Sequence, residues 1–346
     1  MMIIISSNDL IVFYMGLELQ SLCLYVLASY NRDQLKSSEA GLKYFVLSAL
    51  SSGLLLYGCS LIYGFTGSTN FNLIADQLND DQYALTFGIV FILVGLAFKI
   101  SAVPFHMWAP DVYEGSPSSS TFFFSVVPKL AVFVLLVRIF YFSFYGFVDH
   151  WRHFIVLIVI FSIPVGSFGG LEQRKLKTLL VYSTISHMGY SLIAFSAGTF
   201  ESLQMLLSYL IIYSFSGLCI WSIFILTRVK NSYIQKQNKD LTDLVLLGKS
   251  NYMLAIFFTV VLFSVAGFPP MIGFLVKMGV FLTAMEVSMY FVALISILCS
   301  VVGTFYYIRL IKILYFEQLL VGKLYYPINS QSSILITSLF FLFLFL

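Results

Sequence analysis

Ionisable side chains lie inside several long apolar stretches of this sequence, and together they could transfer protons. They are Glu18, Lys43, Lys99, Lys129, Arg138, His187 and Lys277. A charge at the bilayer centre costs on the order of 2.5–3.5 kcal/mol, so such residues normally face a partner or a wet interior. Burial lowers a lysine pKa by up to about 3–5 units and a nearby carboxylate raises it again. A buried Glu/Lys array therefore predicts proton transfer, because each lysine holds or releases its proton as its pairing changes.

Some of these residues also have a simpler interpretation. Glu18 could make a polar contact between two helices. Lys43 lies one turn inside its stretch and could extend its ammonium to the surface, whereas the other three lysines are too deep for this. Arg138 is typical of an interface anchor, and His187 fits a hydrogen-bonded core histidine as well as a proton relay. The remaining histidines lie at the ends of stretches, where a solvated role is expected: His106, His150 and His153.

Helix-breaking residues accompany two of the deep lysines. Pro104 follows Lys99 by five residues, and Lys277 is preceded by Gly267, Pro269, Pro270 and Gly273. Proline inside a helix removes a backbone hydrogen bond, which at membrane depth is tolerated where the backbone is buried in protein or lines a cavity. Broken helices in corresponding positions of two halves indicate an inverted-repeat transporter. Two ordinary proline kinks are the alternative.

The composition describes a chain whose surface faces lipid. Of 346 residues, 60% are hydrophobic and 10% are charged, and the mean hydropathy is +0.93. Soluble domains are about 45–50% apolar and about 25% charged. These values exclude a secreted disulfide scaffold and a cytosolic enzyme, and the net charge of +3 gives no basis for a nucleic-acid partner.

Ten stretches are long enough to span a membrane, which takes roughly 20 apolar residues. Their apolar runs are continuous rather than alternating, which predicts an all-α polytopic membrane protein and not a barrel. The stretches are 9–30, 41–64, 84–103, 118–143, 154–171, 177–197, 203–228, 251–282, 288–315 and 332–346.

The loops between these stretches differ sharply in charge. On one side the only basic residue is Arg152. The other side carries Arg32, Lys36, Arg174, Lys175, Lys177, Arg228, Lys230, Lys236, Lys239, Lys249, Arg309, Lys312 and Lys323. Basic loops face the cytoplasm or the mitochondrial matrix, so we expect the second side to face that compartment.

The chain lacks the signatures of bound redox cofactors. Its four cysteines are far apart and form no CxxC pair, so neither a metal site nor an iron–sulfur site is expected. It also lacks a P-loop and a GxGxxG after a strand. The first ten residues contain no Lys or Arg and do not resemble a signal or transit peptide. If the protein is mitochondrial, we expect it to be made inside the organelle.

Four motifs resemble the NADH dehydrogenase subunit 2 family, which are antiporter-like membrane subunits of respiratory complex I. They are Gly16–Leu22, Glu39–Phe45, Phe98–Pro117 and Tyr182–Tyr190. The third motif is highly specific, and the resemblance runs over essentially the whole chain. The sequences of the motifs resemble plant and protist mitochondrial versions more than the chloroplast relative.

The resemblance implies two inverted five-helix repeats, each with one discontinuous helix. We expect an incomplete first repeat over 1–143, a second over 144–315, and a C-terminal loop and final helix over 316–346. Full-length members have about fourteen helices, and this chain begins at the tail of what resembles the fourth. The missing helices are expected to come from a separate chain, or their space to be filled by other subunits.

The resemblance also implies roles for individual residues. Glu39, Asp111 and Glu114 belong to the motifs but lie near loops, so we expect structural or interfacial roles for them. The proton-transfer residues that it implies are Glu18, Lys43, Lys99, Lys129, Lys277 and His187, with the helix breaks at Pro104, Pro269, Pro270 and Gly273.

The function expected on this basis is proton translocation in the membrane arm of complex I, in the mitochondrial inner membrane with the basic loops in the matrix. NAD, FMN, iron–sulfur clusters and ubiquinone are expected in partner subunits and none in this chain. The expected neighbours are other membrane-arm subunits and lipids, and no nucleic acid. A stand-alone or Mrp-type cation/proton antiporter and a purely structural membrane scaffold are the alternatives. No Asp lies mid-span, which disfavours a sodium path.

Overall fold

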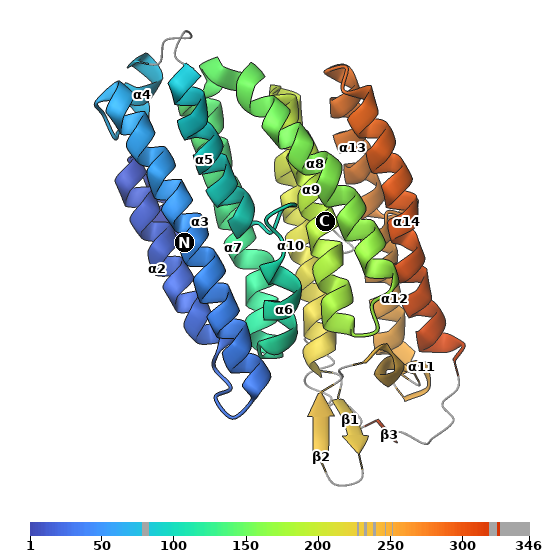
Figure 1. Ribbon diagram of the computed structural model, residues 1–346. Helices are drawn as coiled ribbons and strands as arrows, with labels where there is room; N and C mark the ends of the chain where they lie inside the picture. The colour runs from blue at the N-terminus through green and yellow to red at the C-terminus, as the bar shows by residue number, and fades with distance from the viewer. Residues whose placement is uncertain are drawn as a thin grey trace.

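Long helices cross the computed structural model side by side, with their ends gathered at two opposite edges (Figure 1). The structure describes residues 1–77, 83–226, 228–231, 234–237, 240–245, 247–250, 252–317 and 324–325. The helices of the first part are α1 (Met2–Ser6), α2 (Leu10–Ala28), α3 (Leu35–Thr66), α4 (Phe71–Gln77), α5 (Tyr83–Lys99), α6 (Trp108–Gly115) and α7 (Ser118–Arg138). A π-helical turn (Ile139–Ser143) and a 3-10 turn (Tyr145–Phe147) follow.

The second part contains α8 (Val148–Leu171), α9 (Leu176–Ala197), α10 (Phe200–Leu226), α11 (Leu247–Ser250), α12 (Tyr252–Ala266), α13 (Ile272–Glu286) and α14 (Tyr290–Tyr315), with a 3-10 turn at Leu241–Leu244. A small antiparallel sheet has the strand order β2 (Ile234–Gln237), β1 (Arg228–Asn231), β3 (Leu324–Tyr325). It lies outside the helical bundle, beyond the lower end of α10 (Figure 1), and was not predicted.

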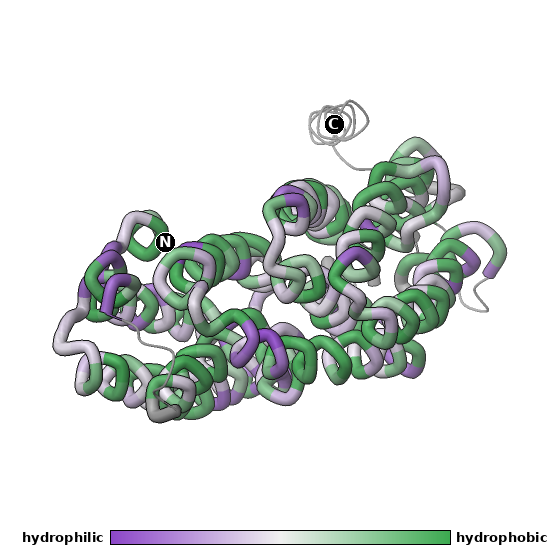
Figure 2. The backbone as a smooth tube through the Cα atoms, turned by 90° about the horizontal axis from the view of Figure 1, so that it is seen from above, coloured by the Kyte–Doolittle hydropathy of each residue, from purple (hydrophilic) through white to green (hydrophobic). Residues whose placement is uncertain are grey.

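Six helical segments in the described part of the chain are long and apolar enough to cross a membrane. They are Leu10–Ala28, Leu35–Thr66, Ser118–Ser143, Tyr145–Leu171, Phe200–Ile225 and Tyr290–Tyr315. Figure 2 shows that most positions along the helices are hydrophobic (green), with hydrophilic positions (purple) between them. The predicted all-α membrane architecture is therefore confirmed. The predicted span 332–346 lies outside the described residues.

Helix α9 occupies the centre of the bundle. It packs against α6, α7, α8, α10, α13 and α14, and all its residues except Lys177 and Tyr182 are buried. A helix enclosed on every side by protein can carry polar groups that lipid would not tolerate. Glycines in the left-handed conformation end both α3 and α9: Gly67 has φ +66° and Gly198 has φ +75°.

Both expected helix breaks are present, one at the end of the predicted span 84–103 and one inside the predicted span 251–282. The first break separates α5, which ends at Lys99, from α6, which begins at Trp108. In the second, the stretch 251–282 is not one span but two helices of 15 residues each, α12 and α13. The peptide bonds before Pro104 and Pro270 are both cis. The alternative of two proline kinks is therefore wrong, because the helices stop and restart.

One hydrophobic cluster joins the two predicted repeats. It runs from Ile4 in α1 to Cys299 in α14 and includes residues of α5, α7, α8 and α9. The predicted boundary between residues 143 and 144 falls between the π-helical turn and the 3-10 turn that connect α7 to α8. The division into repeats stays a prediction.

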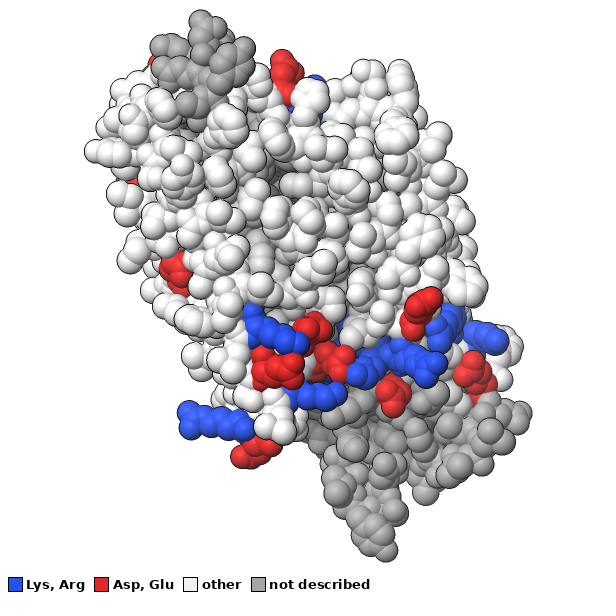
Figure 3. Space-filling model, viewed as in Figure 1, with Lys and Arg blue, Asp and Glu red and all other residues white. Residues whose placement is uncertain are grey.

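Charged residues gather at one edge of the molecule. Figure 3 shows Lys, Arg, Asp and Glu along the edge that carries the α2–α3 loop, α6 and the α8–α9 loop, and few charges elsewhere on this face. The helix surfaces above this edge expose large apolar side chains, such as Leu19, Leu50 and Phe305. The charge asymmetry predicted from the loops is present in the folded molecule.

Candidate functional site

Three lysines from three different helices are buried in the bundle. Lys99 ends α5, Lys129 lies inside α7 and Lys277 lies in the second turn of α13. Their exposed fractions are 8%, 1% and 8%. Among the residues that the structure describes, none of the three forms an ion pair with a carboxylate. Their ammonium groups instead meet hydroxyls and backbone carbonyls, so each positive charge is held by neutral acceptors.

Lys99 is held by a serine of the neighbouring helix. Its Nζ donates to Ser48 Oγ of α3 at 2.7 Å. Glu18 of α2 is near enough to interact electrostatically with Lys99. The Glu18 carboxylate contacts Ser21 Oγ at 3.5 Å, and its Oε1 is buried with no hydrogen-bond partner. Glu18 and Lys99 are therefore electrostatic neighbours but do not form a direct ion pair.

Lys129 contacts the central helix. Its Nζ donates to Thr184 Oγ1 of α9 at 3.0 Å and lies 5.9 Å from the ring centroid of Tyr113, within the range of a cation–π interaction. The Thr184 hydroxyl donates its own proton to the carbonyl of Val181 at 2.8 Å. It can therefore only accept from Lys129.

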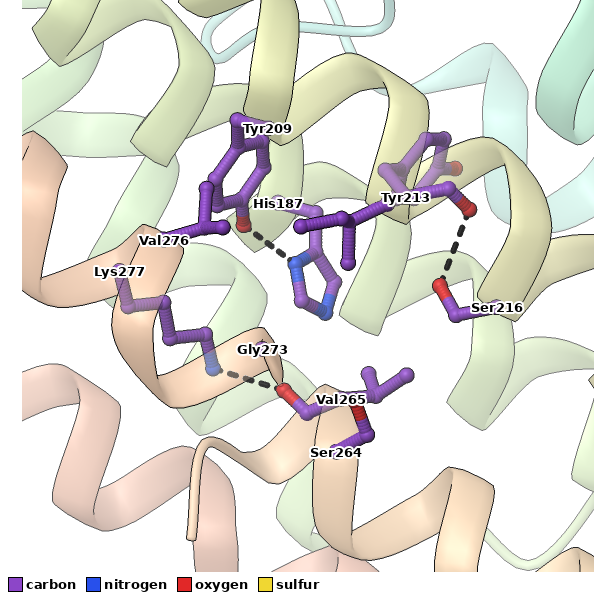
Figure 4. Close-up of a pocket in the computed structure, with 10 residues that line it drawn as sticks. His187, Tyr209, Tyr213, Ser216, Ser264, Val265, Gly273, Val276 and Lys277 are labelled. Atoms are coloured by element: carbon purple, nitrogen blue, oxygen red, sulfur yellow. Dashed lines mark hydrogen bonds between the residues drawn. The ribbon is translucent and has the colours of Figure 1, made fainter. Parts of the chain in front are cut away.

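Lys277 caps the first half of the second broken helix. Its Nζ donates to the carbonyls of Val265 (2.7 Å) and Ala266 (3.0 Å), the last two residues of α12 (Figure 4). The last carbonyls of a helix have no partner within it, and this end carries partial negative charge. The break thus provides two acceptors for a buried ammonium. The ring of Tyr190 lies 5.3 Å from the same Nζ.

His187 lies between the Lys129 and Lys277 contacts on α9. Its Nδ1 is 2.6 Å from the Tyr209 hydroxyl, and its Nε2 is 3.3 Å from the Tyr307 hydroxyl. Figure 4 shows the ring beside a small cavity with a volume of about 20 Å³. Lys277 and Ser264 also line this cavity. A volume of this size fits one water molecule. Ser264 Oγ is buried and has no hydrogen-bond partner.

One face of α9 connects these contacts. Thr184, His187 and Tyr190 follow one another at three-residue spacing, which places them on the same side of a helix. Thr184 meets Lys129, and Tyr190 meets Lys277. The structure therefore brings together Lys129, His187 and Lys277, with Glu18 and Lys99 forming a second group near α2 and α3.

The sequence did not identify the hydroxyl partners of these residues. They are Ser48, Thr184, Tyr209 and Tyr307. The available signal was the density of hydroxyl residues in α9, which has four serines and two threonines in 22 residues of a largely apolar span. Partner residues on other helices leave no such pattern.

The four predicted break residues have different surroundings. Pro104, Pro269 and Pro270 are exposed, and none of them lines the cavity beside Lys277. Gly273 alone of the four lines the cavity beside Lys277. A Cβ on Gly273 would lie 1.9 Å from the carbonyl oxygen of Ser264, so only glycine allows α13 to approach α12 this closely.

Lys43 lies apart from the buried lysines. It is half-exposed and pairs with Glu39 (2.8 Å) and Asp111 (2.9 Å) at the charged edge. This placement matches the interpretation in which its ammonium reaches the surface. Arg138, at the opposite edge, donates to the Ile5 carbonyl and to Asn8 Oδ1, as an anchor there would.

His106 differs from its expected solvated position. It lies in the first break with 9% of its surface exposed, and its Nδ1 is buried with no hydrogen-bond partner. His106 lies just before α6, where its carbonyl accepts a hydrogen bond from Ala109 N at 2.9 Å. His150 and His153 are exposed, as expected.

Glu114 joins three segments at the charged edge. It ends α6 and forms ion pairs with Lys36 of α3, at 3.5 Å, and with Lys175, which precedes α9. Burial acts to raise the pKa of Glu114, but the two lysines outweigh it, so the pKa lies below the ordinary 4.5. The pairs hold the second half of the broken helix against α3 and α9.

Replacing Glu114 with glutamine should weaken this edge in a pH-dependent way. A depressed folded-state pKa stabilises the protein above the unfolded-state pKa, and this stabilisation is lost as pH falls through the folded value. Glu114→Gln should therefore lower the melting temperature at neutral pH, with the difference from wild type vanishing in acid below 4.5. Thermal unfolding in detergent measures this. Glu172→Gln, an exposed site, is the control, and an equal loss at all pH values would contradict the argument.

Comparison with known proteins places the chain in a family. Residues 7–303 match the family described as NADH:quinone oxidoreductase/Mrp antiporter, TM. The chain is 53% identical over 318 residues to NADH-quinone oxidoreductase subunit N of Pelagibacter ubique, covering 92% of this chain and 67% of that protein. It is 45% identical over 356 residues to NADH-ubiquinone oxidoreductase chain 2 of Marchantia polymorpha, covering 100% of this chain and 71% of that protein.

The fold also matches a solved structure. Respiratory complex I from Thermus thermophilus with bound aureothin contains a chain with a TM-score of 0.83 and 29% identity, covering 99% of this chain and 74% of that one. The chain spans about two thirds of the length of the bacterial relatives that it matches. From the extent of the family match and the identity to these relatives, the chain belongs to the NADH:quinone oxidoreductase/Mrp antiporter transmembrane family.

Proposed function

We propose that this chain is a membrane-arm subunit of NADH:ubiquinone oxidoreductase, respiratory complex I, and moves protons through its buried Glu/Lys array. The observation that carries the proposal is the burial of Lys99, Lys129 and Lys277 against neutral acceptors. Redox chemistry belongs to partner subunits, which hold NAD, FMN, iron–sulfur clusters and ubiquinone. This chain converts their signal into proton movement and performs no redox step itself.

The energies of the array suit this role. Moving one charge against 100 mV requires about 2.3 kcal/mol. A Glu–Lys pair closed to 4 Å contributes roughly 4 kcal/mol at an effective dielectric near 20. Glu18 and Lys99 are electrostatic neighbours but not in contact, so closing and opening this pair exchanges an energy comparable to one translocation step.

The proposal includes the surroundings of the chain. Its neighbours are other membrane-arm subunits and membrane lipids. The membrane is the mitochondrial inner membrane, supported by the similarity to the Marchantia polymorpha protein. The charged edge faces the matrix, because basic loops are retained on that side. The stand-alone and Mrp-type antiporter remains the competing assignment.

Lys99→Met in the assembled complex tests the function. Mildly solubilised membranes are separated on a native gel, stained for NADH oxidation with an artificial electron acceptor, and this chain is identified in the bands by its peptides. We expect wild type and variant in the same very large stained band, and loss of proton translocation in vesicles for the variant only. Lys312→Met, an exposed lysine of α14, is the control and should translocate normally.

The other outcomes separate the alternatives. A scaffold would lose the large band when Lys99 is replaced, because its buried charges only hold helices together. A stand-alone antiporter would run as a small, unstained band in wild type. Normal translocation by the Lys99→Met complex would contradict the proposed role of the lysine array.

A further inference from the structure

The imidazole of His187 is contacted on both sides by tyrosine hydroxyls. Tyr209 comes from α10 and Tyr307 from α14, and both are buried, with 5% and 2% of their surfaces exposed. A neutral imidazole has one N–H donor and one bare acceptor nitrogen, whereas a tyrosine hydroxyl donates one hydrogen bond and also accepts. Both tautomers of His187 are therefore satisfied by the same two hydroxyls, without movement of any heavy atom.

Two separate small cavities adjoin this group of three side chains. Tyr209 lines the cavity of about 20 Å³ shown in Figure 4, and Tyr307 lines a second cavity of about 10 Å³. His187 and Lys277 line both cavities. The imidazole ring with its two hydroxyl partners thus lies between two small compartments, and the larger of them has room for one water molecule.

Hydroxyl groups continue beyond Tyr307. Its hydroxyl interacts with the side chains of Ser183 and Tyr306, and Tyr306 interacts with Ser186. Ser183 is adjacent in sequence to Thr184, which accepts the hydrogen bond of Lys129. The Tyr307 side of the ring therefore continues to Ser183 and Tyr306, while the Tyr209 side opens beside Lys277 and Ser264.

Building on the proposed function, we propose that Tyr209, His187 and Tyr307 form a proton relay in which both tyrosine hydroxyls carry the proton. A proton arriving at Tyr209 Oη releases the hydroxyl proton of Tyr209 to His187 Nδ1. The proton on His187 Nε2 passes to Tyr307 Oη, whose own hydroxyl proton leaves toward Ser183 or Tyr306. One proton enters, one leaves, and no electron moves.

The relay passes a single proton before it must reset. After the transfer, the ring carries its proton on Nδ1 instead of Nε2. Rotation about Cβ–Cγ would leave the proton on Nδ1, so the first tautomer is restored by proton transfer. Nε2 takes up a proton from the Lys277 ammonium, which lines both cavities, and Nδ1 then returns a proton to the Lys277 amine before the next proton follows. The two contacts differ in length, 2.6 Å at Nδ1 and 3.3 Å at Nε2, so the Tyr307 contact is the one that must shorten for transfer.

Tyr209→Phe in the assembled complex tests the relay. It removes one hydroxyl and leaves the ring in place. We expect about a hundredfold fall in proton translocation, the lower end of what a positioned acid–base group provides, and a larger solvent deuterium isotope effect. Complex assembly and NADH oxidation by an artificial acceptor should not change. Tyr141→Phe is the matched control, since this hydroxyl donates to the Phe195 carbonyl, away from His187.

The outcomes distinguish the relay from the proposed function. Unchanged translocation and isotope effect in Tyr209→Phe, together with loss of translocation in Lys277→Met, would overturn the relay and leave the function intact. Unchanged translocation in both variants would overturn the function. If Tyr209→Phe does not assemble, Tyr307→Phe is measured in the same way, and normal translocation in that variant overturns the relay. A merely structural role would lower assembly without altering the isotope effect.

Discussion

Replacing Lys277 with methionine should reduce proton translocation by on the order of 10²-fold or more, the range typical of a lost acid–base group. Methionine has a side chain of similar length but has no group that can bind and release a proton. The carbonyls of Val265 and Ala266 also lose their hydrogen-bond donor. Each buried acceptor left without a partner costs about 1–3 kcal/mol. Lys277→Met is therefore expected to lower the stability of the complex as well as its activity.

A second substitution separates these two effects. Lys277→Arg keeps a positive charge and several N–H donors for the two carbonyls, but a guanidinium does not release its proton in proteins. We expect Lys277→Arg to assemble better than Lys277→Met and to translocate equally poorly. Dye-monitored acidification of vesicles and native-gel abundance measure the two quantities. Translocation near the wild-type rate in Lys277→Arg would show that only the charge at this position is required.

Gly273→Ala should prevent normal assembly, although it adds only one methyl group. The new Cβ would lie 1.9 Å from Ser264 O and 2.8 Å from Ser264 C. Both atoms belong to the backbone of α12 and cannot turn aside as a side chain could. The helix α13 would have to move away, and overpacking of this kind costs roughly 1–3 kcal/mol or more. Because Lys277 lies one turn further along α13, its contacts with the Val265 and Ala266 carbonyls would lengthen too.

The control for this substitution is another helical glycine. Gly53 is on the exposed face of α3, and nothing lies within 4 Å of a Cβ built there. Gly53→Ala should be neutral or slightly stabilising, since alanine is favoured over glycine in a helix by about 1 kcal/mol. The abundance of assembled complex is compared on native gels, where a loss of 1–2 kcal/mol changes abundance several-fold. Equal abundance of both variants would contradict the packing argument.

Much of the fold could be predicted because its signals are local. Hydropathy identified the long helices, and the breaks at Pro104 and at Pro269 and Pro270 separate helices in the structure. Charge counting identified the edge to which the basic loops belong. These signals depend on the cost of placing charges and open backbone groups in lipid, which is the same wherever a segment lies in the fold.

The prediction was less successful where it depended on neighbours. Lys43 was placed with the buried lysines in the expected proton-transfer array, but it pairs with two carboxylates at the edge, whereas Lys99 is buried. His106 was expected in solvent and is buried. Depth in a sequence stretch does not show which way a side chain points or what covers it.

The sequence by itself determined that lysines at three positions must be buried in a membrane protein, and that two helices must break beside them. Only the tertiary structure decided which group each of these residues meets. Lys99 binds a serine 51 residues away, Lys129 a threonine 55 residues away, and His187 a tyrosine 120 residues away. Such pairs form when separate helices pack, and packing depends on the shapes of whole helix faces rather than on the local sequence around either partner.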